Sequence, residues 1–339
     1  MLTESVLKAL ADPTRLRIMR LLSSMELAVG ELAHVLAQSQ PRVSRHIAIL
    51  CDVGLAERRR EGSWVFLRET ASRAGTGSLL GQIEHLLDAA EHDDPEFAQI
   101  CDSDRRHLAQ IRESRELHAA EYFARNAQSW DSLRAMLAPA GEVEAALSEA
   151  LGPNPPGQVL DIGTGTGRIA ELLCPNAEHV VALDKSPEML RLARARLQDM
   201  PPDSVELIQG DFTSLPFDEA RFDTVIFHQV LHYAHEPAYA LAEAARVCKP
   251  GGRIAIVDLA THDQEELRTV HAHARLGFSD QQMTALLSDQ GFTPCPPRSV
   301  NGGKLQVCVW TGTRRPPSVA RIKADHSLTI PPTKKAHAR

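Results

Sequence analysis

The stretch Val159-Leu160-Asp161-Ile162-Gly163-Thr164-Gly165-Thr166-Gly167 decides the fold of the larger part of this chain. It is an apolar run that ends in a turn with glycine at every second position, and residues 168–173 then have the composition of a helix. Glycines let the backbone come close to a ligand because they carry no Cβ. The spacing is not that of dinucleotide-binding loops, and no Gly-Lys-Ser/Thr follows, so a Walker loop is not indicated.

Apolar runs alternate with amphipathic segments from Gln158 to about Trp310, which predicts a mostly parallel sheet. Three runs end in candidate ligand contacts, which are Asp184 after 179–183, Gly210, Asp211 and Phe212 after 205–209, and His228 and Gln229 after 222–227. Open α/β sheets bind ligands at the carboxyl ends of their strands, so these positions predict one common site. A carboxylate at Asp184 can accept hydrogen bonds from both hydroxyls of a ribose.

Five segments carry a family resemblance. They are LDIGTGTGRIAELL (160–173), ALDKSPEML (182–190), QGDFTSLPF (209–217), FDTVIFHQVLHY (222–233) and RVCKPGGRIAIVD (246–258). This part of the chain closely resembles the class I S-adenosylmethionine-dependent methyltransferases. The resemblance implies a Rossmann-like α/β fold with a mostly parallel seven-stranded sheet. It also implies a site for S-adenosylmethionine (SAM) or S-adenosylhomocysteine (SAH).

The resemblance assigns roles within that site. Asp161, Gly163 and Gly165 would cradle the amino-acid end of the ligand, and Asp184 would bind its ribose. The full predicted set is Tyr122, Asp161, Gly163, Thr164, Gly165, Gly167, Asp184, Lys185, Met189, Gly210, Asp211, Phe212, His228 and Gln229. Within it, Met189, Asp211 and Phe212 would surround the adenine. Tyr122 is a candidate contact for the ligand's carboxylate, but it could equally pack the linker helix together with Trp130.

Two histidines are the candidate catalytic bases. His228 and His232 flank the expected acceptor pocket, where they could accept a proton or serve only as polar lining. No Asn/Asp-Pro-Pro-Tyr/Phe motif follows the fourth strand, which argues against methylation of adenine, cytosine or amide nitrogen. The motifs alone do not establish catalysis, because the same residues bind SAM and SAH.

The first 68 residues contain a different pattern. Asp12-Pro13 opens a helix, with further helices over 29–36 and 41–50, and two strands over 55–60 and 63–68 surround Glu61-Gly62. Val43, Ile47 and Leu50 fall on one side of the third helix and can pack inward. The predicted DNA contacts are Gln40, Arg42, Ser44, Arg45 and His46 on that helix, and Arg58, Arg59 and Arg60 on the hairpin.

The segments LKALADPTRLRIMRLL (7–22), SQPRVSRHIAIL (39–50) and GLAERRREGSWVFL (54–67) resemble the ArsR-type winged-helix repressors. That resemblance implies a winged helix-turn-helix, mostly α-helical with a β-hairpin wing, and a homodimer on a near-palindromic double-stranded DNA operator. Many members sense metals through cysteines where this chain has Ala28 and Gly30, so no metal is predicted as the signal. Asp104, His107, His118 and Glu121 only approximate another metal pattern and are interpreted as a solvated helix.

Composition limits the partners. The 339 residues are 43% hydrophobic and 24% charged with a net charge of −7, so DNA contact must come from a local basic patch. The first residues do not resemble a signal peptide, no apolar run is long enough to span a membrane, and the six cysteines are scattered. We therefore expect a cytoplasmic location. The predicted divisions are a DNA-binding domain (1–70), a helical linker with dimerisation and lid functions (71–150), a SAM/SAH domain (151–312) and a basic disordered tail (313–339).

Two functions are consistent with this combination. The fused arrangement resembles SAH-responsive repressors of methionine-cycle genes, and the reader lacks its family's cysteine sensor. The favoured hypothesis is therefore a transcriptional regulator, a repressor, whose methyltransferase-like domain senses SAH or SAM. The alternative is an active SAM-dependent small-molecule methyltransferase with an autoregulatory winged helix. The sequence does not decide between SAM and SAH, and it does not identify the operator or the methyl acceptor.

Overall fold

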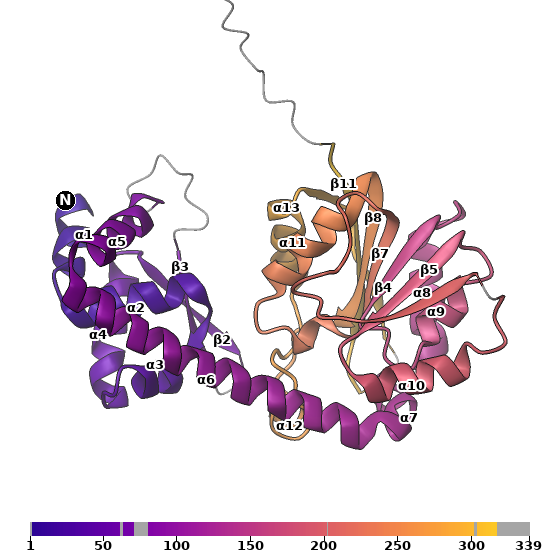
Figure 1. Ribbon diagram of the computed structural model, residues 1–339, viewed down its shortest axis with the longest axis horizontal. Helices are drawn as coiled ribbons and strands as arrows, with labels where there is room; N and C mark the ends of the chain where they lie inside the picture. Colours follow the sequence, from indigo (N-terminus) through magenta and orange to yellow (C-terminus); the bar gives the residue numbers. More distant parts are fainter. Residues whose placement is uncertain (1, 62–63, 71–80, 202, 302–303, 317–339) are drawn as a thin grey trace, which may run out of the picture.

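The computed structural model describes residues 2–61, 64–70, 81–201, 203–301 and 304–316 (Figure 1). The N-terminal domain, called the reader below, is a winged helix-turn-helix, as the sequence predicts. Its elements are α1 (Leu2–Leu10), α2 (Pro13–Ser24), β1 (Leu27–Ala28), α3 (Val29–Val35), α4 (Gln40–Asp52), β2 (Ala56–Glu61) and β3 (Trp64–Glu69). Strands β1, β3 and β2 form an antiparallel sheet in that order. The hairpin of β2 and β3 is the wing.

Local interactions fix the reader helices. The Asp12 carboxylate accepts the backbone N–H groups of Thr14 and Arg15 at 2.9 and 3.2 Å, so it caps α2. Val43, Ile47 and Leu50 of α4 are buried in the reader core. This inward packing leaves the opposite side of α4 available for contact outside the domain.

Two helices extend the reader core. Helix α5 (Gly81–Asp93) contributes Ile83 and Leu87, and helix α6 (Pro95–Asn126) contributes Leu108. Helix α6 has 32 residues and is therefore about 48 Å long. Figure 1 shows it running from the reader to the second domain. The two domains thus share one continuous helix.

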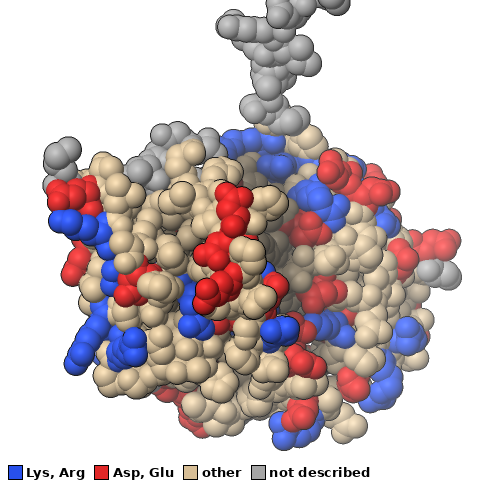
Figure 2. Space-filling model, turned by 60° about the vertical axis from the view of Figure 1, so that its left-hand side comes forward, with Lys and Arg blue, Asp and Glu red and all other residues tan. Residues whose placement is uncertain are grey.

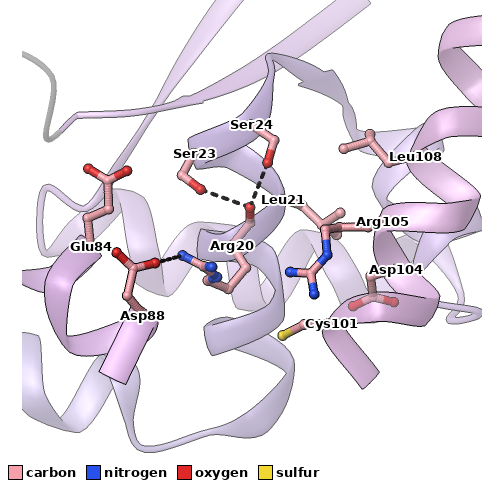
Figure 3. Close-up of a pocket in the computed structure, with 10 residues that line it drawn as sticks. All are labelled: Arg20, Leu21, Ser23, Ser24, Glu84, Asp88, Cys101, Asp104, Arg105 and Leu108. Carbon is pink, nitrogen blue, oxygen red and sulfur yellow. Dashed lines mark hydrogen bonds and ion pairs between the residues drawn. The ribbon is translucent and has the colours of Figure 1, made fainter. Parts of the chain in front are cut away.

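Ion pairs attach α6 to the reader. Asp104 accepts two hydrogen bonds from Arg17 of α2, at 2.7 and 2.6 Å, and it is 4% exposed, so the expectation of a solvated helix is wrong at this residue. Beside it, α2, α5 and α6 border a cavity of about 270 Å³ (Figure 3). Figure 3 shows Arg20 bonded to Asp88 at one side of this cavity. Arg20 also bonds Glu91, so the charged lining of this cavity is largely engaged in joining the helices.

The second domain is a twisted α/β sheet. Its elements are η2 (Ala127–Ser129), α7 (Trp130–Leu137), α8 (Ala140–Leu151), β4 (Gln158–Ile162), α9 (Arg168–Leu173), β5 (His179–Asp184), α10 (Pro187–Arg196), β6 (Val205–Gln209), β7 (Phe222–His228), η3 (Leu231–Tyr233), α11 (Pro237–Val247), β8 (Cys248–Leu259), α12 (Glu265–Thr269), α13 (Asp280–Asp289), β9 (Phe292–Pro294), β10 (Arg298–Val300) and β11 (Val307–Arg314).

The sheet order is β10-β11-β8-β7-β4-β5-β6, and the pairs from β8 to β6 are parallel. Strand β11 is antiparallel to β8, and β9 and β10 pair with its two halves. This order contains seven strands, with β9 paired outside it, and it confirms the predicted mostly parallel sheet. Separate apolar clusters cover the two faces of the sheet, as parallel strands require.

Two predicted boundaries differ from the structure. Helix α8 begins at Ala140, before the expected boundary at 151, and its residues Val143 and Leu147 pack in a cluster with sheet residues, so the layers of this domain begin earlier. The tail was expected from 313, but Thr313 and Arg314 pair with β9 as part of β11. Residues 317–339, the rest of that tail, lie outside the described residues. Among the helices that are described, none has an apolar stretch long enough to cross a membrane.

Candidate ligand site and DNA-binding surface

A cavity of about 520 Å³ opens at the carboxyl ends of β4, β5 and β7, and residues of α6 line its other side. This volume falls in the range of about 300–1,000 Å³ typical of small-molecule sites. Ten predicted ligand contacts line it, namely Gly163, Thr164, Gly165, Asp184, Lys185, Met189, Asp211, Phe212, His228 and Gln229. Tyr122, Asp161, Gly167 and Gly210 lie outside this lining. We call the space the SAM cavity, after the ligand that the sequence predicts for it.

The glycine loop needs its glycines for conformation and for space. Gly163 has φ 69°, and a Cβ there would lie 2.3 Å from Cγ2 of Val230. Gly165 has φ 56°, and its N–H donates to Oδ2 of Asp184 at 2.8 Å. Larger residues would be strained at both positions. The loop therefore keeps its backbone close to the cavity.

Two buried polar atoms of the cavity lining are unpaired among the described residues. They are Nε2 of His228 and Oε1 of Gln229. An unsatisfied buried polar group costs about 1–3 kcal/mol, so such atoms indicate a missing polar partner. Gln229 also has φ 53° directly after β7, a strained conformation that clusters at functional sites. A ligand with hydroxyl, amino and carboxylate groups, such as SAM or SAH, fits this arrangement.

Asp161 lies behind the glycine loop. It is fully buried and accepts a hydrogen bond from Oγ1 of Thr164 at 2.6 Å. Burial raises its pKa to about 6, although the Thr164 bond and the charge of Arg134 oppose the rise. Asp161 therefore supports the loop and does not contact the cavity directly.

Arg134 of α7 is a site residue that the sequence reasoning missed. Its side chain is 14% exposed and lines the SAM cavity, and Nη1 lies 3.4 Å from Nδ1 of His228. A guanidinium in this position can hold a carboxylate by charge-assisted hydrogen bonds. No motif marks Arg134, because its place depends on how α7 packs beside the glycine loop.

Tyr122 was predicted as a contact for the ligand's carboxylate, but the structure places it elsewhere. Its hydroxyl lies 2.8 Å from Nδ1 of His271, and its ring packs edge-on against Trp130 at 6.5 Å between centroids. Its position therefore agrees with the alternative role, in which Tyr122 and Trp130 pack the linker helix. The hydroxyl is already engaged by the second domain.

The two candidate bases differ in position. His228 lines the cavity, and burial, reinforced by Arg134, lowers its pKa to about 3. A neutral ring that accepts from Arg134 at Nδ1 carries its hydrogen at Nε2, so it can donate a hydrogen bond there but cannot accept a proton. His232 lies outside the cavity lining, with Nδ1 2.6 Å from Oδ1 of Asp258. Neither geometry is that of a general base facing the cavity.

The predicted adenine contacts lie at the far side of the glycine loop. Asp211 accepts hydrogen bonds from Lys185 at 2.8 Å and from the N–H of Thr213 at 2.8 Å. Burial alone would raise the pKa of Asp211, but these bonds hold it below its ordinary value of 3.8. Met189 and Phe212 provide apolar surface beside this carboxylate.

The reader presents the second candidate site. Gln40, Arg42 and Arg45 are exposed on α4, and Ser44 and His46 are half-buried, with His46 turned toward Asp12 at 3.6 Å. Arg58 and Arg60 are exposed on β2. Figure 2 shows acidic and basic side chains interspersed over one face of the molecule, without a broad basic field. Any DNA contact on that face therefore depends on individual residues.

Arg59 does not match its prediction as a DNA contact. Its guanidinium donates to both carboxylate oxygens of Glu26, at 2.7 and 3.0 Å, and lies 5.0 Å from the Phe66 ring centroid. Successive side chains on a strand point to opposite faces, so Arg59 faces inward where Arg58 and Arg60 face outward. Arg59 is therefore held inward by the strand alternation and by the buried Glu26 carboxylate opposite it.

Glu26 joins the reader to the second domain. Its carboxylate also accepts a hydrogen bond from Arg275 at 2.8 Å, and its N–H donates to Glu236 at 2.6 Å. The side chains of Glu26 and Arg275 are only 6% and 5% exposed. Burial favours the neutral acid, but Arg275 and Arg59 hold the pKa of Glu26 below its ordinary value of 4.5. The ionised carboxylate therefore bridges two arginines at the domain interface.

Comparison with known proteins agrees with both halves of the chain. The family of bacterial regulatory proteins of the arsR type matches residues 12–58. The family of methyltransferase domains matches residues 160–256. The chain therefore carries an ArsR-type helix-turn-helix domain followed by a class I SAM-dependent methyltransferase domain.

Known methyltransferases are similar to part of this chain. A demethylmenaquinone methyltransferase of Clavibacter sepedonicus is 40% identical over 34% of this chain and 46% of its own length. A malonyl-[acyl-carrier protein] O-methyltransferase of Methylococcus capsulatus is 31% identical over 50% of this chain and 64% of its own. A solved SAM-dependent methyltransferase from Aquifex aeolicus aligns with 23% identity and a TM-score of 0.45, covering 56% and 97% of the two chains. The chain thus spans about half to two thirds of these two curated relatives.

Proposed function

We propose that this protein is a SAM-dependent small-molecule methyltransferase joined to its own DNA-binding regulator. The observation that supports this most is the SAM cavity, where predicted ligand contacts from separate motifs line one space beside unpaired buried polar atoms. When bound there, SAM supplies an electrophilic methyl group on a sulfonium sulfur and leaves as SAH. The named methyltransferases among the relatives favour catalysis over binding alone.

In this proposal the residues of the chain bind and orient the two reactants, and none of them forms a covalent bond to either. Asp184 holds the ribose, Arg134 holds the carboxylate of the ligand, and the glycine loop excludes water from one side. His228 donates from Nε2 and orients a bound group, since its low pKa prevents it from taking a proton. Proximity and alignment would then supply most of the rate enhancement. The two curated relatives act on different acceptors, so their names do not fix the acceptor here.

The test of this proposal is ligand binding and methyl transfer. In calorimetry with SAM and with SAH, Asp184→Asn should weaken both by at least about tenfold, because charged hydrogen bonds are worth about 1.5–3 kcal/mol. Asp199→Asn, an exposed carboxylate outside the cavity lining, is the matched control. Labelled methyl should pass from SAM into quinol, phenol or carboxylate acceptors offered as a panel. Unchanged affinity in D184N would overturn the assignment of the site.

A ligand-sensing role is a second candidate, and one contact favours it. Met25 of the reader lines the SAM cavity, and the next residue, Glu26, holds Arg59 of the wing. A ligand that displaces Met25 would thereby act on the wing, with a coupling of about 1–3 kcal/mol if it is typical. This proposal includes a homodimer, for which exposed Leu2 and Leu7 on α1 and Leu86 on α5 offer apolar surface.

Sensing is tested separately from catalysis. A duplex selected by the full chain from a random pool is titrated with protein alone, with SAM and with SAH. A sensor shows DNA affinity that changes at least about fivefold with one ligand. Equal affinity under all three conditions would exclude sensing and leave the methyltransferase proposal intact. Sedimentation of the free and DNA-bound protein reports whether it is dimeric.

A further inference from the structure

One face of α6 runs the length of the SAM cavity. The residues that line the cavity from this helix are Arg112, Arg115, Glu116, Ala119, Ala120 and Phe123. They follow helical spacing, so they form a single stripe about 16 Å long. Glu116 bonds Lys185, which also bonds Asp211 of the predicted adenine site. The stripe therefore runs beside the part of the cavity assigned to SAM or SAH, and its Arg112 and Arg115 end extends to the reader.

The stripe has an aromatic end beside the glycine loop. The Phe123 ring packs edge-on against Tyr233 at 4.8 Å and against Trp130 at 5.5 Å between centroids. All three residues line the cavity, as do Ala119 and Ala120 in the middle of the stripe. This lining suits the apolar body of an elongated molecule.

The other end of the stripe is basic. Arg115 is paired with Glu31, and its Nη1 lies 3.5 Å from Nδ1 of His235. Arg112 differs, because its hydrogen bonds go to the backbone oxygen of Ser24 at 2.9 Å and to the sulfur of Met25 at 3.2 Å. Among the described residues, Arg112 has no carboxylate partner within ion-pair distance, whereas Arg115, Arg134 and Lys185 each have at least one. Its charge is therefore available to a bound anion.

We propose that the methyl acceptor is an elongated, mainly apolar molecule with an anionic end, and that Arg112 binds that end. The inference rests on the proposed methyltransferase function and names its substrate class. The apolar body lies along α6 toward Phe123, and the anionic group takes hydrogen bonds from the guanidinium at the opposite end of the stripe. Arg112 is thus a specificity-determining residue.

The position of Arg112 also makes the reader part of the acceptor site. Ser24 is the last residue of α2, and Met25 follows it before β1. An anion bound by Arg112 would lie against this end of α2, beside Ser24 and Met25. The reader therefore closes one end of the acceptor site.

The experiment uses the full chain and two fluorescent probes of the same length. Dansylaminoundecanoate carries a carboxylate, and its methyl ester has no charge. Fluorescence titration, with SAH present and with SAH absent, should show the acid binding at least about tenfold more tightly than the ester. Arg112→Gln should abolish this preference, and Arg112→Lys should retain most of it.

Arg106→Gln is the matched control, since Arg106 is exposed on the same helix outside the cavity lining. It should keep the wild-type preference. Equal binding of acid and ester to the wild type overturns the proposal, as does a preference for the acid that survives in R112Q. SAH affinity, measured in the same samples, distinguishes a failure of the proposed methyltransferase function from a failure of the role given to Arg112. If the wild type does not bind SAH, the proposed function is contradicted. The preference for the acid over the ester still decides the role of Arg112.

Discussion

Arg58 and Arg60 lie on one face of β2, and Arg59 lies on the other. The outer pair is exposed, whereas Arg59 is held by Glu26 and packs on Phe66. Three identical neighbours therefore divide between two tasks according to the two-residue period of a strand. The outer pair can reach the phosphates of DNA, and the inner arginine attaches the wing to the rest of the protein.

This division makes the wing a connection between the two domains. Glu26 accepts hydrogen bonds from Arg59 on one side and from Arg275 on the other. Arg268, also of the second domain, lies over the Phe66 ring at 5.3 Å. A movement of the second domain relative to the reader must therefore break a buried ionic contact or carry the wing along with it.

Among the substitutions considered, removal of the Glu26 charge should decrease the free energy of unfolding most, because it breaks the connection between the wing and the second domain. Glu26→Gln leaves Arg59 and Arg275 buried without their counter-charge, and breaking a buried pair in this way costs about 3–5 kcal/mol. We expect a loss of about 3 kcal/mol in the free energy of unfolding, measured in urea. The control is Glu57→Gln, whose half-exposed pair with Arg68 should contribute at most about 1 kcal/mol. Similar losses in the two variants would refute the interpretation.

Acid should remove the same contribution in the wild-type protein. The folded-state pKa of Glu26 lies below its ordinary value of 4.5, so its stabilising effect is complete above that value. The effect is lost as the pH falls through the folded-state pKa. The difference in stability between wild type and E26Q should therefore be constant from about pH 7 to about pH 5 and shrink below about pH 4. A difference that already shrinks between pH 7 and pH 5 would mean that another group is responsible.

The sequence contained the alternation that separates Arg59 from its neighbours, but it did not contain the partner. Glu26 and Arg275 are far apart in the chain, and only the packing of the two domains brings both against Arg59. Arg134 was missed for a similar reason, because α7 meets the glycine loop through tertiary packing. By contrast, the glycine loop and the strand-end carboxylates were predictable, since local backbone geometry and strand order place them. Local rules thus gave the fold and the strand-end part of the cavity lining, but not the lining from α6 and α7 or the contacts between domains.

The outer arginines should control affinity for DNA. The logarithm of the DNA association constant falls as salt concentration rises, and each lost phosphate contact makes this slope less steep by about 0.9. The double variant Arg58→Ala with Arg60→Ala should therefore decrease the magnitude of the slope by about 1.8 on a duplex of arbitrary sequence. Arg59→Ala should leave the slope within error of the wild type, because Arg59 faces Glu26. An equal decrease in R59A would show that the wing turns this arginine toward DNA.

A substitution of Trp64 should have the smallest effect among the tests of how the wing is attached to the second domain. Arg268 lies 5.7 Å from the Trp64 ring centroid, and Trp64 is 40% exposed. A cation–π contact at such a site is worth about 0.5–1 kcal/mol. Trp64→Ala should lower the free energy of unfolding by more than this amount, because it also removes the stacking of Trp64 on Phe66, and Trp64→Phe should recover part of the loss. The pairwise term comes from a double-mutant cycle with Arg268→Gln. If the two substitutions are simply additive, the Arg268–Trp64 pair does not hold the domains together, and the attachment of the wing rests on Glu26 with Arg59 and on the contact of Arg268 with Phe66.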